Sequence, residues 1–424
     1  MSDSTMNLIS RRERVLGGGA PLFYEEPVHI VRGEGVFLFD ADGKRYLDMY
    51  NNVPCVGHAN PHVVDAMHRQ ASTLNVHSRY LHEGVIDYAE RLVAKHHASL
   101  DRIVFTCTGT EANEAAIAMA RFATGGQGII CTGHAYHGNS ALVSKLTWAG
   151  HRSDPEIRSV RFPEIYRPIE AGLSSSELAD LYLVDVQAAI ESFAAARVPL
   201  AGMLVCPIFA NEGLPTIPGG YMARAAAMVR DAGGLFIADE VQAGFCRSGR
   251  WWGYEVSDFV PDIATMGKPM GNGLPLAGAV ARADLVDTFR QKSAYFNTFA
   301  ASPLQAAAGA AVLDVIEAEK LQERVAEVGA YLRDGLRKID CEAIGDVRGH
   351  GLFTGIDWVS DRGAKTPDVE GVKRVVNHLK EKGFLTSHAG AAFNVLKIRP
   401  PLVFRHEHAD LFLTAFEETL REFY

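Results

Sequence analysis

Short apolar runs alternate with longer segments of helical periodicity between about residue 100 and residue 320. The runs are RIVFTCT, GIICTG, GMLVCPIF, LFIADEV, DIATMG and LAGAVAR, and Ala-rich segments such as TEANEAAIAMARFAT and GGYMARAAAMVRDAG lie between them. Continuous apolar runs are typical of strands that are covered on both faces of a sheet. The pattern therefore predicts an α/β domain with a mainly parallel sheet covered by helices.

The pattern changes towards both ends of the chain. GEGVFLFDADGKRYLDMYNN predicts a hairpin that turns at Asp42-Gly43 in a type I′ turn and packs with the C-terminal part. The C-terminal part alternates GDVRGHGLFTGIDWVS, the helix DVEGVKRVVNHLKEKG, NVLKIRPPLVF and a final helix, which predicts a small α+β domain. One helical segment, from Ser302 to Ile339, is long enough to leave one domain and enter another. The predicted divisions are an N-terminal segment 1–60, a large domain 61–320 and a small domain 321–424.

Composition and charge narrow the class of protein. The 424 residues are 47% hydrophobic and 22% charged, as in ordinary globular proteins. The net charge of -9 argues against a nucleic acid or an anionic membrane as partner. No apolar run reaches the roughly 18 residues of a membrane span, and the N-terminus lacks a signal-peptide core, so we expect a cytoplasmic protein. Six scattered cysteines without a C-x-x-C pair predict reduced thiols and no metal site.

Ligands of open α/β sheets bind beyond the carboxyl ends of the strands, and four predicted strand ends carry polar groups. TGTEANEAA brings Gly109 and Thr110 to the start of a helix. Their backbone N–H groups could bind a phosphate there, or Thr108 or Thr110 could simply cap the helix. IADEVQAGF carries Asp239 and Glu240. One of these acids could face a pyridinium nitrogen, or it could cap a helix or form a salt bridge.

The other two strand ends carry a lysine and an aromatic pair. Lys268 lies between Gly267 and Pro269, which exclude a simple position on a helix surface. A lysine desolvated at a strand end has a lowered pKa and can form a Schiff base with an aldehyde, or it can bind a phosphate as a point charge. Tyr136 and His137 follow a strand, and an aromatic ring there could stack on a planar ligand or pack in the ordinary way.

Together the four strand ends describe one ligand. A phosphate cradle, a stacking aromatic, a buried acid and a Schiff-base lysine are the groups that bind pyridoxal 5'-phosphate. A dinucleotide site is excluded because no G-x-G-x-x-G follows a strand, and no Walker P-loop occurs. We therefore expect pyridoxal phosphate as the cofactor.

These motifs resemble those of the class III pyridoxal-phosphate aminotransferases of fold type I. The resemblance runs from GEGVFLFDADGKRYLD to LKIRPPLVF and is most specific from LFIADEVQAGFCRSGRWWGYE through PDIATMGKPMGNGLPLAG. It implies the fold type I architecture and an obligate homodimer with shared active sites. The implied roles are a covalent link to the cofactor for Lys268, pairing with the pyridine nitrogen for Asp239, a place near the 3′ oxygen for Gln242, stacking for Tyr136 beside His137, and phosphate binding for Gly109, Thr110 and, from a partner subunit, Thr298.

Within this family the chain more closely resembles the ethanolamine-phosphate phospho-lyases, which eliminate phosphate instead of transferring an amino group. YLDMYNNVPCVGHANPHVV, with its paired Asn51-Asn52, and LNVHSRYLHEGVIDYAERL carry this resemblance. Arg399, in IRPP, favours the other activity, because aminotransferases bind a substrate carboxylate with it. Cys246 departs from the family, which has glycine there, and predicts a different local backbone.

The substrate side has four candidate residues. Arg79 and Arg399 could bind a substrate phosphate through two parallel hydrogen bonds. Arg79 could instead form a salt bridge on a helix surface or at a dimer interface, and Tyr50 and Glu212 could line the substrate side. The leading hypothesis is a phospho-lyase that converts O-phosphoethanolamine to acetaldehyde, ammonia and phosphate. The alternatives are an ω-aminotransferase that acts on an amine or ω-amino acid with a keto acid acceptor, an aminomutase, and a binding protein on a degenerate fold.

Overall fold

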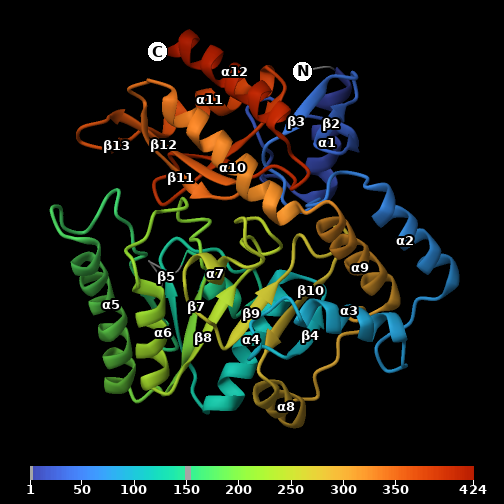
Figure 1. The fold of residues 1–424 in the computed structure, drawn as a ribbon, viewed down its shortest axis with the longest axis vertical. Helices are drawn as coiled ribbons and strands as arrows, with labels where there is room; N and C mark the ends of the chain where they lie inside the picture. The colour runs from blue at the N-terminus through green and yellow to red at the C-terminus, as the bar shows by residue number, and fades with distance from the viewer. Residues whose placement is uncertain (1–2, 149–153) are drawn as a thin grey trace.

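The computed structural model describes residues 3–148 and 154–424, and a small α+β part lies over a large α/β part (Figure 1). The large sheet has the strand order β4-β10-β9-β8-β7-β5-β6. Its strands are β4 (Arg102–Thr106), β5 (Gly128–Thr132), β6 (Ile157–Val160), β7 (Leu200–Val205), β8 (Leu235–Asp239), β9 (Ile263–Met266) and β10 (Ala277–Ala281). The pairs from β9 to β6 are parallel, and β10 is antiparallel to both β4 and β9. The sheet is therefore mainly parallel, with one reversed strand.

Helices cover both faces of this sheet, as the continuous apolar runs predict. Ile129 and Ile237 pack on one face with α4 (Gly109–Thr124) and α8 (Ala283–Lys292). Ile130 and Phe236 point to the opposite face, towards α5 (Ser175–Ala195) and α6 (Tyr221–Asp231). The period of two along each strand thus sends apolar side chains into two separate cores. The remaining elements of this part are α2 (Pro61–Thr73), α3 (Glu83–Val93), the 3₁₀ helix η1 (Val143–Lys145), α7 (Gly253–Val256) and α9 (Pro303–Ala318).

The small part contains two sheets that join both ends of the chain. One has the order β11-β12-β16-β15, with β13 beside β12, and the other has the order β1-β2-β3-β14. Since β14 pairs in parallel with β3, the N-terminal hairpin packs with the C-terminal part, as predicted. The strands are β1 (Ile30–Glu34), β2 (Phe37–Asp40), β3 (Arg45–Asp48), β11 (Ile344–His350), β12 (Phe353–Asp361), β13 (Thr366–Pro367), β14 (Phe384–Leu385), β15 (Ser387–Ala389) and β16 (Val395–Ile398). The helices are α1 (Asp3–Leu16), α10 (Leu321–Lys338), α11 (Val369–Glu381) and α12 (His406–Phe423). The divisions at residues 60 and 320 stay predictions.

Two local predictions were wrong. The hairpin pairs β2 with β3, but its turn is not type I′, because only Gly43 has a positive φ (84°) and a type I′ turn needs two such residues. The helix expected from Ser302 to Ile339 is two helices, α9 and α10. Lys320, with φ 50°, lies in the left-handed region, which a right-handed helix cannot continue through.

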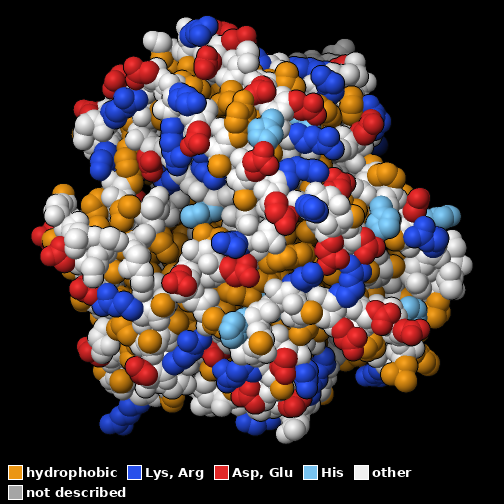
Figure 2. Space-filling view, viewed as in Figure 1, with side chains coloured by type: hydrophobic (Ala, Val, Ile, Leu, Met, Phe, Trp, Pro, Cys, Tyr) orange, Lys and Arg blue, Asp and Glu red, His pale blue; other side chains and the backbone are white. Residues whose placement is uncertain are grey.

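The face of the molecule seen in Figure 2 shows no concentration of one charge. Figure 2 shows Lys and Arg side chains interspersed with Asp and Glu over the visible face. Among the described residues, no helix combines the length and the apolar character that a membrane crossing needs.

Candidate active site

A cavity of about 150 Å³ lies at the carboxyl ends of the central strands of the large sheet. Each of β4, β5, β7, β8 and β9 contributes lining residues where it ends or within a few residues of its end. The lining residues are Gly109, Thr110, Tyr136, His137, Gly138, Cys206, Asn211, Asp239, Val241, Gln242 and Lys268. Seven of the eight cofactor-binding candidates from the sequence therefore lie around one cavity, and Thr298 is the eighth.

The start of α4 forms one end of the cavity. Thr108 is the N-cap, and its hydroxyl accepts the Glu111 N–H at 3.1 Å. The Glu111 carboxylate in turn accepts the Cys107 N–H at 2.7 Å. The helix-cap interpretation thus holds for Thr108, yet it leaves Gly109 and Thr110 in the first turn, where N–H groups have no intrahelical acceptor.

Two glycines keep this end open for a ligand. A Cβ added to Gly109 would lie 2.8 Å from the Val241 side chain, and one added to Gly138 would lie 2.5 Å from the Thr110 hydroxyl. Side chains at these positions would fill the space beside the helix N-terminus. The cradle therefore fits a phosphate, which the N–H groups and the helix dipole favour.

Asp239 ends β8 at the floor of the cavity and is fully hydrogen-bonded. Its Oδ2 lies 2.7 Å from His137 Nδ1 and accepts from Asn113 Nδ2 at 3.0 Å, while Oδ1 accepts the Val241 N–H at 3.0 Å. Asn113 is itself oriented by the Thr265 hydroxyl, which donates to its Oδ1 at 2.6 Å. Burial alone would raise the pKa of Asp239, but the contact with His137, together with the hydrogen bonds from the Val241 N–H and Asn113, outweighs burial, and the pKa lies below its usual value.

The neighbouring acid has a structural task. Glu240 accepts the Gly253 and Tyr254 N–H groups, each at 2.8 Å, at the start of α7. Burial raises the pKa of Glu240 to about 8. Each of the two interpretations thus fits one of the adjacent acids. Glu240 binds a helix terminus, and Asp239 remains an ionised carboxylate that can hold a proton on a ring nitrogen.

Lys268 follows β9 and projects into the same cavity. Burial, and next the positive charge of Arg399, lower the pKa of Lys268 to about 8, although Asp239 acts in the opposite direction. A lysine with such a pKa carries a neutral, nucleophilic amine in an appreciable fraction of molecules near neutral pH. The geometry and charge therefore fit a lysine that reacts with an aldehyde.

Two buried cations, Lys397 on β16 and Arg399 just after it, contact Gln242 in the lining of the cavity. Lys397 donates to the Ala210 carbonyl at 2.9 Å and lies 3.4 Å from Gln242 Oε1, which also accepts from Arg399 Nη1. Gln242 Nε2 donates to Asn211 Oδ1 at 3.3 Å, so its amide oxygen points at the two cations. Burial is the main cause that lowers the pKa of both Lys397 and Arg399. The charges of Arg399 and Lys268 lower the pKa of Lys397 further, whereas Tyr50 and Asp48 act in the opposite direction on Arg399.

The Asn51-Asn52 loop lies against this wall. Asp48, the last residue of β3, accepts the Tyr50 N–H at 3.0 Å and the Asn51 N–H at 2.9 Å. The Tyr50 carbonyl accepts from Arg399 Nε at 2.7 Å, and the Arg399 guanidinium lies 4.4 Å from the centre of the Tyr50 ring. Asn52 Nδ2 lies 3.5 Å from the Gln242 carbonyl. The loop thus fixes Arg399 from the side opposite Gln242.

Five candidates are not in the cavity lining within one chain: Tyr50 and Arg399, described above, and Arg79, Thr298 and Glu212. Arg79 lies on the surface with its guanidinium 4.1 Å from the centre of the Phe296 ring, and Thr298 is exposed beside it. Glu212 is buried behind the wall, where it accepts the Thr132 hydroxyl at 2.8 Å. Its carboxylate also accepts the Asn211 N–H at 3.2 Å, and a place for Glu212 on the substrate side stays a prediction.

Several lining or supporting residues were not predicted from the sequence. Lys397 had a usable signal, since it stands two residues before Arg399 in a strand and therefore shares its face. Cys246 has φ 63°, a left-handed backbone that glycine adopts without strain. The expectation of a different local backbone at this position stays a prediction. The other residues missed were Asn113, Gly138, Cys206, Asn211 and Val241.

Comparisons with known proteins agree with this geometry. The model of the class-III aminotransferase family matches residues 23–420. A phospholyase from Arthrobacter, solved in complex with phosphoethanolamine, is 42% identical and superimposes with a TM-score of 0.95 over 98% of this chain and 100% of that one. The alanine–glyoxylate aminotransferase 2 homolog 2 of Arabidopsis thaliana is 37% identical, covering 97% of this chain and 87% of that protein. The ethanolamine-phosphate phospho-lyase homolog 1 of Caenorhabditis elegans is 32% identical, covering 98% and 94%.

Proposed function

The chain belongs to the class III aminotransferases, a family of fold type I enzymes that depend on pyridoxal phosphate, and we propose that it is a phospho-lyase acting on O-phosphoethanolamine. The products are acetaldehyde, ammonia and phosphate. The observation that carries the proposal is the pair of buried cations, Lys397 and Arg399. Within the described part of the chain, neither of them forms an ion pair with a carboxylate.

Two adjacent positive charges without a counter-ion favour a dianionic ligand. The partners of Lys397 and Arg399 are neutral oxygens: the carbonyls of Ala210 and Tyr50 and the amide oxygen of Gln242. Buried charges are costly unless they are paired, so an anion that enters this space gains from both cations. A phosphate monoester brings close to two negative charges near neutral pH, whereas the carboxylate of an amino acid brings one.

The cofactor fits the other side of the cavity. Gly109 and Thr110 would bind its phosphate, Asp239 would hold the proton on its ring nitrogen, and Lys268 would form the covalent link. When bound, it supplies an electron sink for the carbon that bears the substrate amine. His137 keeps the Asp239 carboxylate ionised and oriented, and so acts on the cofactor through it.

Lys268 and the two cations, Lys397 and Arg399, have separate roles in the elimination. The amine of Lys268 takes the proton from the carbon that bears the amino group. The bond between the next carbon and the phosphate oxygen breaks, and the phosphate leaves with the electron pair while Lys397 and Arg399 hold it. The two-carbon enamine that remains takes up water and gives acetaldehyde and ammonia.

The second candidate is an ω-aminotransferase. The similarity to alanine–glyoxylate aminotransferases and the presence of Arg399 support it. An aminotransferase must admit two different substrates in turn, and one of them is a keto acid. In this chain Arg399 is held by Tyr50 on one side and by Gln242 on the other, which favours a single substrate with a fixed anion position.

Phosphate release without a keto acid distinguishes the two activities. The purified protein, loaded with pyridoxal phosphate, should release phosphate and acetaldehyde from phosphoethanolamine in equal amounts over many turnovers. An aminotransferase stops after one half-reaction when no acceptor is present. A single turnover without phosphate, followed by steady turnover once pyruvate or glyoxylate is added, would contradict the lyase and establish the second candidate.

We also propose a homodimer in which Arg79 and Thr298 serve the active site of the partner. Support comes from an exposed apolar surface around these two residues, formed by Leu74, Tyr80, Leu81, Phe296 and Phe299. Leu81 is fully exposed and Phe299 is 75% exposed in the single chain, which is unusual for a surface left in water. Sedimentation at micromolar concentration should give twice the chain mass of 46.1 kDa, and a monomer would contradict the proposal.

A reducing compartment, the cytoplasm, is proposed as the location. All six cysteines are free, and five of them are buried. Reduced thiols in such positions are typical of proteins from reducing compartments.

A further inference from the structure

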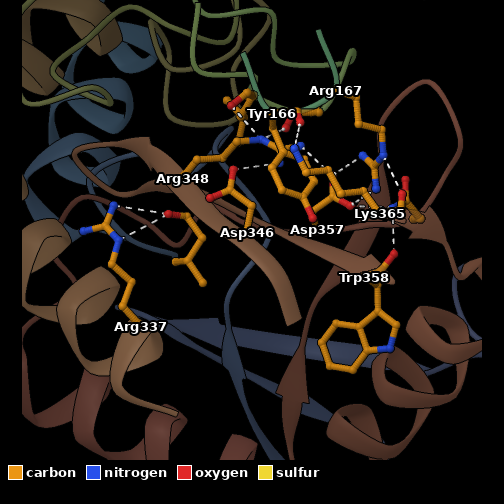
Figure 3. Close-up of polar contacts among 12 residues, drawn as sticks. Tyr166, Arg167, Arg337, Asp346, Arg348, Asp357, Trp358 and Lys365 are labelled. Atoms are coloured by element: carbon orange, nitrogen blue, oxygen red, sulfur yellow. Dashed lines mark hydrogen bonds and ion pairs between the residues drawn. The ribbon is translucent and has the colours of Figure 1, made fainter. Parts of the chain in front are cut away.

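We propose that Asp357, on β12 of the small part, is a positioning residue for the substrate wall. Asp357 fixes the side chain of Arg348 (Figure 3), and Arg348 holds residues 209–214, here called the wall loop, against the cavity. The wall loop carries Ala210 and Asn211, which contact Lys397 and Gln242. The inference goes beyond the reaction itself, since it concerns what keeps the two buried cations in place.

The wall loop has a strained backbone that needs support. Phe209 and Leu214 are buried and have φ angles of 49° and 56°, a left-handed conformation that bulky residues adopt only when their surroundings impose it. Gly213, with φ 106°, leaves no room for a side chain, because an added Cβ would lie 3.0 Å from Val395. A loop of this kind relaxes when its contacts are removed.

The guanidinium of Arg348 supplies contacts that support the wall loop. Its Nε donates to the carbonyl oxygens of Gly213 at 3.0 Å and Leu214 at 3.1 Å. Its two remaining nitrogens bind carboxylates, Nη2 to Asp357 at 3.0 Å and Nη1 to Asp346 at 3.1 Å. The guanidinium is therefore fixed by Asp346 and Asp357, and it binds the carbonyl groups at the end of the wall loop.

Asp357 is fully buried and its carboxylate is saturated by four donors. Arg167 binds both oxygens, at 2.8 and 2.6 Å, and Arg348 and Asn394 complete the set at 3.0 and 2.7 Å. Figure 3 shows Arg167 and Arg348 on the two sides of Asp357. Arg167 follows β6 of the large part, so this one carboxylate ties the large part, the small part and the wall loop together.

Loss of the hydrogen bonds to Asp357 should weaken substrate binding more than it slows the chemical step. A shift of the wall loop moves the acceptor of Lys397 and the partner of Gln242, and through Gln242 it releases Arg399. Lys268 and Asp239 lie at the ends of β9 and β8, which the wall loop does not support. The kinetic part of the test rests on the proposed function, whereas the hydrogen-exchange part does not.

The test compares Arg167→Ala with Arg161→Ala in the cofactor-loaded enzyme. Arg161 is a matched control because it lies in the same segment and binds both oxygens of Asp185, at 2.7 and 2.8 Å, without any contact to the wall loop. For Arg167→Ala we expect the KM for phosphoethanolamine to rise about tenfold and kcat to stay within about twofold, with faster amide exchange in residues 209–214. Arg161→Ala should change none of these three quantities.

Arg167→Lys keeps the charge but not the double hydrogen bond, and its KM and exchange rate should fall between those of the wild type and Arg167→Ala. Wild-type KM and wild-type exchange at 209–214 in Arg167→Ala would overturn the inference. So would an increase in exchange spread evenly over the chain, which a general loss of stability produces. If the wild type does not act on phosphoethanolamine, the proposed function fails, and the exchange at 209–214 still decides this inference.

Discussion

Replacing Lys268 by alanine should lower the turnover of phosphoethanolamine by about four orders of magnitude or more, because in the proposed reaction the residue serves both as the covalent anchor and as the base. Its position allows both tasks: it follows β9, it faces Asp239 across the cavity, and its pKa is lowered to about 8. The variant should still bind pyridoxal phosphate weakly, since the phosphate cradle and Asp239 are intact. Phosphate release under saturating substrate and cofactor measures the loss.

A chemical label separates loss of the anchor from loss of the fold. Borohydride should attach the cofactor to the peptide that contains Lys268 in the wild type, and mass spectrometry should find no such peptide in Lys268→Ala. Lys373→Ala is the control, because Lys373 is half-buried on α11, lies outside the cavity lining and forms an ion pair with Glu370. It should keep wild-type turnover and labelling. Turnover of Lys268→Ala within tenfold of the wild type would contradict the assignment of the whole site.

Much of the cavity could be predicted because the sheet is parallel. Gly109 and Lys268 are separated by more than half the length of the large part, yet each follows a strand whose carboxyl end lies at the same edge. Apolar runs locate the strands, and the parallel arrangement then brings the residues that follow them together. The same argument placed Tyr136 and Asp239, which is why chemistry at strand ends was informative before any contact was known.

Residues whose position depends on packing between parts could not be found in this way. Lys397 comes from a strand of the small part, and only the docking of that part over the large sheet brings its amine to Gln242. Asn113 lies in the first turns of α4 among alanines, where an asparagine gives no sign that it binds Asp239. The break between α9 and α10 at Lys320 contains no Gly or Pro, so the helical periodicity of the sequence continues through it.

Arg79 and Thr298 illustrate another limit. The resemblance to class III enzymes assigns Thr298 to a partner's site, and the single chain places it on an exposed apolar surface. A site completed by a second chain cannot be built from contacts within one chain. In the proposed homodimer, the exposed surface around Phe299 would meet the partner and complete its site.

Replacing Lys397 by methionine should lower kcat/KM for phosphoethanolamine about a hundredfold, or by close to 3 kcal/mol, because it removes one of two buried charges that hold the substrate phosphate. Methionine has a similar length and flexibility, so it fills the space beside Phe353, although the Ala210 carbonyl loses the hydrogen bond that the ammonium donates to it. Inorganic phosphate, which competes for the same cations, should inhibit the variant more weakly by a similar factor. Initial rates at varied substrate and phosphate concentrations measure both effects.

Lys380→Met provides the matched control for this substitution. Lys380 is 5% exposed and Lys397 4% exposed, both belong to the small part, and Lys380 lies on α11 away from the cavity. Its replacement should leave kcat/KM and phosphate inhibition unchanged. If Lys397→Met instead retains kcat/KM within threefold, the two cations do not bind the substrate phosphate and the lyase loses its main physical support. If it loses activity on phosphoethanolamine but keeps cofactor binding and wild-type stability, the charge of Lys397 is needed for the phosphorylated substrate.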